Sequence, residues 1–169
     1  MRSGAGSSAG GCPRRPGATR RWHRLLALGA LLLAAAACAT GSGPRKACLR
    51  FDAAEDLNLY NGQSHPVTVF VFPLSSSAAF EQKSVEDLLG APTGSGILAA
   101  PVVITIAPGE QDRRLEKLFP AETAQLGVVA DYYRSRNAPE GSRRQIVPAR
   151  CLPFLTPRLT MTTTDLYTN

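Results

Sequence analysis

The clearest pattern in the chain is an extended segment with apolar side chains on both of its faces. Residues 67–74 read VTVFVFPL, with three valines on one face and two phenylalanines and a leucine on the other. Apolar residues on both faces are typical of a central strand that is covered on both sides. We therefore predict a buried strand at 67–74, with other strands beside it.

Shorter segments predict these other strands. Residues 47–54 partly alternate, with Leu49 and Phe51 on one side and Arg50 and Asp52 on the other, which is the period of a half-buried strand. Further strands are expected at 102–107, 113–119 (an edge strand in preference to a helical turn), 126–134, 145–147, 151–155 and 158–162. Seven or eight short strands separated by turn residues predict an all-β protein with a two-sheet β-sandwich.

One helix is expected to interrupt this series of strands. Residues 78–89 place Phe80, Val85 and Leu88 near one face, and Gly90 follows as a stop signal. This spacing predicts a single amphipathic helix inserted after the central strand.

The first part of the chain has a different pattern, because thirteen apolar or small residues (25–37) lead to Cys38. Five arginines stand close before them, at positions 14, 15, 20, 21 and 24. A basic region, a short apolar region and small residues at a cleavage zone are typical of a secretory signal peptide. The apolar run is shorter than the about 20 residues that a membrane-spanning helix needs.

The four residues Ala35-Ala36-Ala37-Cys38 resemble a bacterial lipobox, in which the cysteine is lipidated and becomes the first residue of the mature protein. We therefore predict three parts: a lipoprotein signal peptide at 1–37, a lipidated cysteine with a flexible tether at 38–46, and a β-sandwich domain at 47–169. By analogy with bacterial lipoproteins, Ala39 after the cysteine favours transport to the outer membrane. An ordinary signal peptide cleaved nearby, or a short membrane anchor, are the alternatives.

The predicted cleavage changes the meaning of the net charge. The whole chain has 19 basic and 13 acidic residues, a net charge of +6. Six of the basic residues and none of the acidic ones precede Cys38, so the mature part has 13 of each. A neutral mature protein gives no sign of nucleic-acid binding. Its 132 residues suffice for one domain with a core of its own.

Two cysteines remain for the folded domain, Cys48 and Cys151. An even pair in an exported protein favours a disulfide, and two buried free thiols are the alternative. A bridge that closes about 100 residues is worth about 4 to 5 kcal/mol in the chain-entropy account. Two isolated cysteines and one mature histidine, His65, do not form a set of metal ligands.

The sequence gives little support to an enzyme. His65 stands in a turn without an evident partner, and Asp131 lies in the middle of a predicted strand, where a position facing solvent or a backbone partner is the simpler interpretation. No pair of carboxylates is placed by a motif for acid–base catalysis. Gly94–Ala99 formally fits a dinucleotide motif, but it follows a predicted helix and precedes a strand, the reverse of what that site needs. We predict neither catalytic residues nor a cofactor.

The loop at 55–66 (EDLNLYNGQSHP) is unusual for a plain connection. Asn61-Gly62 is a strong turn dipeptide, yet Leu57, Leu59 and Tyr60 are apolar residues in a polar segment. These three side chains either fold back onto the core or form a contact surface, since tyrosine offers a large contact area at low entropic cost.

An ordered set of residues resembles the outer-membrane lipoprotein family of the type VI secretion system, the TssJ (SciN/VasD) family. The set runs from the lipobox-like Cys38 to Arg134. It comprises Cys38, Asn58, Gly62, Pro66-Val67 leading into VTVFVFPL, Ala79-Phe80, Pro108-Gly109-Glu110, Leu126 to Ala130 and Tyr133-Arg134. The resemblance implies a transthyretin-like two-sheet β-sandwich with an inserted helix, acylated (palmitate) and held on the periplasmic face of the outer membrane.

The resemblance also implies a partner and a binding site. The partner is the periplasmic C-terminal domain of the inner-membrane component TssM, and through it TssL, with TssA-type proteins in the same assembly. The family's contact loop corresponds to 55–66 here. The residues expected to form the contact are Glu55, Asp56, Leu57, Asn58, Leu59, Tyr60, Asn61 and Gly62, with the leucines and the tyrosine as anchors and the two acids as a polar rim. The alternative function is a general periplasmic β-sandwich lipoprotein that binds a small ligand or peptide.

Overall fold

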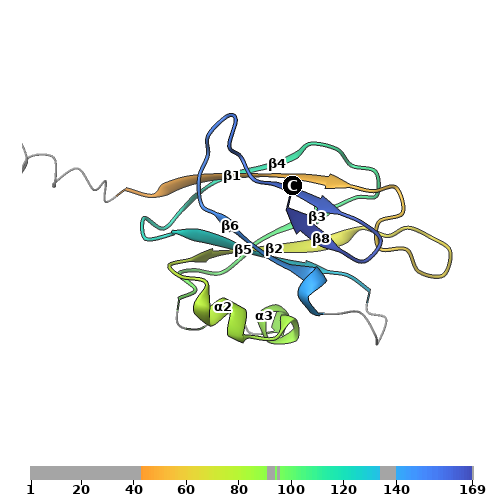
Figure 1. Cartoon of the computed structure of the whole chain (residues 1–169), viewed down its shortest axis with the longest axis horizontal. Helices are drawn as coiled ribbons and strands as arrows, with labels where there is room; N and C mark the ends of the chain where they lie inside the picture. Colours follow the sequence, from red (N-terminus) through yellow and green to blue (C-terminus); the bar gives the residue numbers. More distant parts are fainter. Residues whose placement is uncertain (1–42, 91–93, 95, 134–139, 169) are drawn as a thin grey trace, which may run out of the picture. The chain divides into compact units, whose positions relative to one another are not determined.

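The computed structural model describes residues 43–90, 94, 96–133 and 140–168. The signal peptide, Cys38 and most of the tether lie outside the described residues. Within them, eight strands form two four-stranded sheets, in the orders β4-β1-β7-β8 and β3-β2-β5-β6 (Figure 1). The strands are β1 Arg45–Ala53, β2 Val67–Leu74, β3 Val102–Ile106, β4 Arg113–Phe119, β5 Gln125–Asp131, β6 Arg144–Pro148, β7 Arg158–Met161 and β8 Leu166–Thr168.

Strands β1 and β2 are inner strands, one in each sheet. Strand β1 pairs antiparallel with β4 and parallel with β7, whereas β2 lies between β3 and β5 and is antiparallel to both. The expected transthyretin-like two-sheet β-sandwich is confirmed, and so are the central position of 67–74 and the strand at 113–119.

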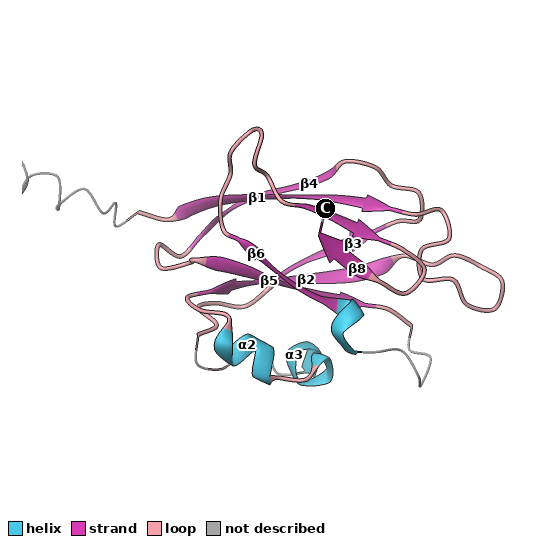
Figure 2. Cartoon of the chain, in the orientation of Figure 1, coloured by secondary structure: helices cyan, strands magenta, loops and turns pink. Residues whose placement is uncertain are grey.

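The main core lies between the sheets. It includes Leu49 and Phe51 from β1 and the three valines of β2, all essentially inaccessible to water. The other face of β2 is covered by the short helices α2 (Ala78–Gln82) and α3 (Val85–Gly90) (Figure 2). There Phe72, Leu74, Phe80, Val85, Leu88 and Val129 form a second buried cluster. Strand β2 is apolar on both faces because each face belongs to a different core.

The single helix predicted at 78–89 is wrong, because the chain forms two helices with a break between them. Lys83 ends α2 in an extended conformation, with φ −83° and ψ 145°. Val85 is five positions after Phe80, whereas side chains on one helical face are three or four positions apart. The break lets both side chains reach the same sheet.

The segment predicted as a strand at 151–155 is also wrong. Residues 153–155 form a turn, and no residue of the segment is in a strand. Two other strands differ from their predicted bounds. Strand β1 begins two residues earlier than predicted, and β5 ends at Asp131, three residues earlier than predicted. The last strand at 158–162 is followed by a separate strand, β8, which pairs with β7.

The connection between β6 and β7 is joined to β1 by a disulfide. Cys48 in β1 and Cys151 in the connection are bonded, their Cα atoms are 4.7 Å apart, and 103 positions separate them in the sequence. The Cys48 amide also donates a hydrogen bond to the Arg150 carbonyl (3.1 Å). The expected pair of cysteines thus closes most of the domain into a covalent loop.

Candidate partner-binding site at one end of the sandwich

The loop between β1 and β2 forms a small hairpin. Tyr60 and Gln63 exchange two backbone hydrogen bonds of 3.0 Å each. Between them, Asn61 and Gly62 have φ values of 52° and 72°, which is the left-handed geometry that Asn-Gly adopts in a two-residue turn. The turn signal in the sequence therefore produces a defined protrusion beyond the end of β1.

Two buried residues hold this hairpin in place. Leu57 is fully buried and belongs to the main core, and Asn58 is only 7% exposed. The Asn58 side-chain oxygen accepts a hydrogen bond from the Tyr133 amide (2.8 Å), and its nitrogen donates one to the Pro66 carbonyl (3.4 Å). The sequence left two alternatives for Leu57, a place in the core or in a contact surface, and the structure places it in the core. Leu57 and Asn58 position the loop and present no side chain to a partner.

An aromatic stack forms the adjoining surface. The Tyr60 ring lies between His65 (centroids 3.7 Å apart, planes at 15°) and Tyr133 (4.3 Å, 22°). Tyr133 is 63% exposed, and Leu59 beside the stack is 45% exposed. His65 is therefore a stacking partner of Tyr60, although the sequence showed no partner for it.

Tyr133 is a candidate site residue that sequence reasoning missed. It lies 73 positions after Tyr60, just beyond the end of β5, and only the fold brings the two together. Its neighbour Tyr132 is buried and donates a hydrogen bond from its hydroxyl to the Asp165 carbonyl (2.9 Å). Burial raises the pKa of Tyr132 far above its usual value, so this phenol stays protonated and keeps donating.

Acidic side chains border the hairpin, as expected. Glu55 and Asp56 are both exposed. An Asp56 carboxylate oxygen accepts a hydrogen bond from the Thr163 hydroxyl (2.6 Å), which links the hairpin to the turn between β7 and β8. The Ala54 carbonyl accepts another from the Gly109 amide (3.0 Å). The β1–β2 loop is thus hydrogen-bonded both to the turn between β7 and β8 and to the turn between β3 and β4 that contains Gly109.

Behind this end, a charged cluster connects β1, β7 and the residue before β4. The Asp52 carboxylate accepts hydrogen bonds from the Arg158 guanidinium (2.7 Å to one oxygen, and a closer contact to the other) and from the Asp112 amide (3.0 Å). The Arg158 hydrogen bonds, opposed by burial, hold the pKa of Asp52 below its usual value. This cluster fixes the end of β1 from which the hairpin leaves.

Asp131 has a structural contact. Its carboxylate lies 3.3 Å from a guanidinium nitrogen of the buried Arg143, which also contacts Glu86 at 3.3 Å. Arg143 further donates a hydrogen bond to the Ala130 carbonyl (3.3 Å). The arrangement secures the end of β5.

One group of potential metal ligands occurs in the described residues, formed by Cys48, Glu116 and Cys151. Because the two cysteines are bonded to each other, their sulfur atoms are not thiolates and the group is no metal site. In the part of the chain that the structure describes, no helix is long and apolar enough to cross a membrane.

A comparison with protein families decides the affiliation. The family model described as "Type VI secretion lipoprotein, VasD, EvfM, TssJ" matches residues 45–162, which is most of the chain and nearly all of the described sandwich. The chain belongs to the type VI secretion lipoprotein family. This TssJ-family chain has no match among curated proteins.

Solved structures share the fold of this TssJ-family lipoprotein. Lip from Serratia marcescens, described as a membrane-bound component of the type VI secretion system, is 20% identical with a TM-score of 0.61 over 75% of this chain and 96% of Lip. The lipoprotein TssJ1 from Pseudomonas aeruginosa is 24% identical, with a TM-score of 0.60 over 75% of this chain and 95% of TssJ1.

A further match comes from a structure described as "T6SS protein TssM C-terminal domain (869-1107) from EAEC". The matched chain is 16% identical with a TM-score of 0.63, over 74% of this chain and 98% of its own length. At these identities the likeness shows the fold alone. The family is one of structural lipoproteins of the secretion system, and enzyme activity is not a known property of it.

Proposed function

We propose that this lipoprotein holds the periplasmic C-terminal domain of TssM at the outer membrane, and through TssM the inner-membrane component TssL. The observation that carries the proposal is the surface that the exposed Leu59 and Tyr133 form with the half-buried Tyr60, beside a hairpin that is fixed from behind. A large aromatic patch on a preorganised support is the kind of surface that supplies binding hot spots.

A further argument comes from the structure named after the TssM domain. The span 869–1107 in that description is longer than this whole chain of 169 residues. About three-quarters of this chain is nevertheless enough to cover 98% of the matched chain, so the matched chain is shorter than the TssM span. We infer that the matched chain is a separate sandwich protein present beside the TssM domain. That inference supports a TssM-type partner for this lipoprotein.

The membrane attachment is the second part of the proposal. The signal peptide at 1–37, acylation of Cys38 and a short tether would place the sandwich at the periplasmic face of the outer membrane. A Cys38→Ser variant should then appear in the soluble periplasmic fraction, whereas the unaltered protein should sediment with outer membranes. Equal membrane recovery of the two proteins would contradict acylation at Cys38.

The binding site is tested by calorimetry with the TssM C-terminal domain from the same genome. We expect one-to-one binding by the chain from Ala39, and a loss of affinity of about tenfold or more for Tyr60→Ala or Leu59→Ala, as hot-spot truncations of over 1 kcal/mol produce. Leu118→Ala is the matched control, because Leu118 is 61% exposed on β4, outside the hairpin. Unchanged affinity in both hairpin variants would exclude this surface.

A further inference from the structure

A second apolar surface lies on the connection between β6 and β7. Leu152, Phe154 and Leu155, here called the apolar loop, are 48%, 97% and 53% exposed. Several large apolar side chains exposed next to one another are uncommon on the surface of a soluble protein and mark an interaction site. Phe154 is more exposed than any other large apolar side chain in the described part of the chain.

The backbone of the apolar loop is held rigidly. The Leu155 amide donates a hydrogen bond to the Leu152 carbonyl (3.1 Å), and the Thr156 hydroxyl donates one to the same oxygen (2.8 Å). Cys151, the residue before Leu152, is bonded to Cys48. These links define the backbone turn from which the exposed side chains project.

Its position is close to the start of the described domain. Cys48 is three residues after Arg45, which is about 10 Å at the rise of a strand. In Figure 1 the blue connection rises near the middle of β1, while the β1–β2 hairpin leaves the end of that strand. Leu152 lines a cavity together with Lys46 and Arg50 of β1. The apolar loop therefore lies beside the first part of β1, away from the strand end that leads to the proposed TssM surface.

The chain length before Arg45 limits how far this end can move from a lipid anchor. Seven residue steps separate Cys38 from Arg45, a reach of about 25 Å at most. Three residues further on, Cys48 carries the apolar loop through the disulfide. An acylated Cys38 would keep the loop at a high effective concentration next to the bilayer surface.

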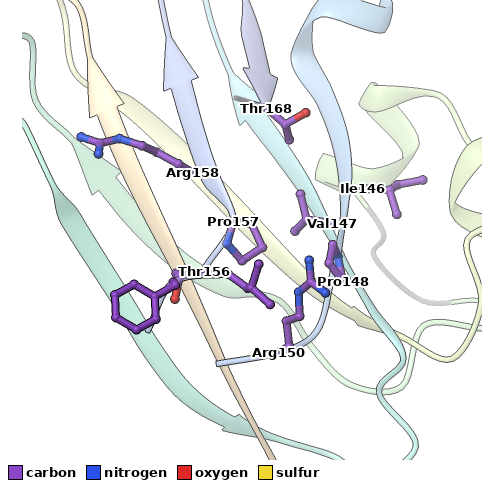
Figure 3. Close-up of a pocket in the computed structure, with 10 residues that line it drawn as sticks. Ile146, Val147, Pro148, Arg150, Thr156, Pro157, Arg158 and Thr168 are labelled. Atoms are coloured by element: carbon purple, nitrogen blue, oxygen red, sulfur yellow. The ribbon is translucent and has the colours of Figure 1, made fainter. Parts of the chain in front are cut away.

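The charges around the apolar loop suit a phospholipid surface. Exposed basic side chains line the cavities on its two sides: Lys46 and Arg114 beside Leu152, and Arg150 beside Phe154 and Leu155. Arg114 is paired with Asp112 (2.8 Å). Glu116, which is paired with Lys46, is the acid among the residues that line the adjoining cavity of about 370 Å³. Figure 3 shows Arg150 beside the second cavity, of about 350 Å³, on the β6 side of the same connection. Lysine and arginine near the surface are attracted to anionic headgroups.

We propose that the apolar loop is a membrane-contact element, which inserts Phe154 and its leucine neighbours between lipid headgroups beside the acylated cysteine. The proposal rests on the lipid anchor of the proposed function, because the anchor supplies the proximity. A second contact next to the anchor adds buried apolar area to the attachment that the acyl chains on Cys38 provide. The contact would also fix the orientation in which the hairpin faces TssM.

The test uses a tryptophan as a depth reporter. The only tryptophan of the chain, Trp22, lies in the predicted signal peptide, so a Phe154→Trp variant of the chain from Ala39 contains a single one. About three-quarters of this chain covers 96% of Lip and 95% of TssJ1, and we expect the chain from Ala39 to fold without the leader. Tyr133→Trp, at the proposed TssM surface, is the matched control because Tyr133 is also exposed.

Each variant is held by an N-terminal hexahistidine tag on vesicles of phosphatidylethanolamine and phosphatidylglycerol that contain a nickel-chelating lipid. For Phe154→Trp we expect a blue shift of emission, quenching by brominated acyl chains and loss of quenching by aqueous iodide. Tyr133→Trp should show none of these changes. Adding Leu152→Ser and Leu155→Ser to the Phe154→Trp variant should return its emission toward that in solution.

Equal emission and equal iodide quenching of the two reporters would overturn the membrane-contact proposal. A blue shift of the Phe154→Trp reporter that needs the soluble TssM domain would also overturn it, and would assign the loop to a protein partner. The tag makes the result independent of acylation. The lipid anchor is tested in a separate experiment with the full-length protein after its expression and purification. If the anchor is absent, that protein should not float with vesicles.

Discussion

The ring of Phe80 in α2 lies directly against the backbone of Gly127 in β5. A Cβ atom at Gly127 would be 2.6 Å from two of the ring carbons. Phe80 is fully buried, its ring centroid is 5.6 Å from that of Phe72, and the Arg144 guanidinium lies over it at 5.9 Å. The absence of a side chain at one position in β5 thus allows the short helix to pack on the sheet.

Gly127→Ala should lower the free energy of unfolding by about 1–3 kcal/mol, the usual cost of overpacking a core. Urea denaturation measures this loss. Adding Phe80→Leu should recover part of it, because the smaller side chain leaves space for the new methyl group. Gly90→Ala is the control, since a Cβ at Gly90 meets nothing within 4 Å. Equal destabilisation by the two alanines would contradict the close contact.

Asn58→Ala should be destabilising by about 2 kcal/mol or more. The residue has a φ of 50°, which costs an ordinary side chain about 1–2 kcal/mol, and the change also removes hydrogen bonds to the Tyr133 amide and the Pro66 carbonyl. Asn58→Gly tolerates the backbone conformation but still loses both bonds. We expect thermal midpoints in the order Asn, Gly, Ala, and weaker TssM binding for both variants. A stable Asn58→Ala protein would show that the hairpin needs no support.

Removing the disulfide by Cys48→Ser and Cys151→Ser should cost about 4 kcal/mol, because the bridge closes a loop of about 100 residues in the unfolded chain. The chain from Ala39 is suited to this experiment because it lacks Cys12 and Cys38. Urea unfolding with and without a reducing agent gives the same comparison without mutation. Identical midpoints under both conditions would contradict a bonded pair.

The Asp52–Arg158 pair predicts a specific dependence of stability on pH. The pKa of Asp52 is lower in the folded protein than the ordinary value of 3.8. Its ionised form therefore stabilises the fold above pH 3.8, and this contribution is lost as the pH falls through the folded-state value. Asp52→Asn should be less stable than the unaltered protein at pH 7, with a smaller difference at pH 3.

Urea unfolding at the two pH values checks this dependence on Asp52. Glu122→Gln is the control, because Glu122 is an exposed acid outside the cluster, and it should change stability little at either pH. A difference between Asp52→Asn and the unaltered protein that is equal at pH 7 and pH 3 would assign the effect to something other than ionisation.

The strands with a simple pattern were predictable because burial alone determines them. Residues 67–74 and 102–107 became β2 and β3 with little change. The helical region was not, because the break at Lys83 depends on where the sheet lies beneath Phe80 and Val85. The segment 151–155 forms no strand, although it contains apolar residues, because Leu152, Phe154 and Leu155 face solvent in a turn instead of packing in a sheet.

The candidate partner site was predictable only in part. The hairpin and its turn follow from Asn61-Gly62, a local signal. The burial of Leu57, next to the exposed Leu59, depends on how the hairpin meets the core. The contact of Tyr60 with Tyr133 joins segments that are distant in the sequence, and no local pattern encodes such a contact.

Strand β1 has a mechanical consequence for a protein held at both ends. Tension applied between Arg45 and Ala53 acts along the strand, whose hydrogen bonds to β4 and β7 run across the pull. Such loading shears many bonds at once instead of opening them one by one. At Cys48 the covalent link to Cys151 shares the load with the β6–β7 connection. Because β1 is paired on both sides, it should resist stretching better than a strand at the edge of a sheet.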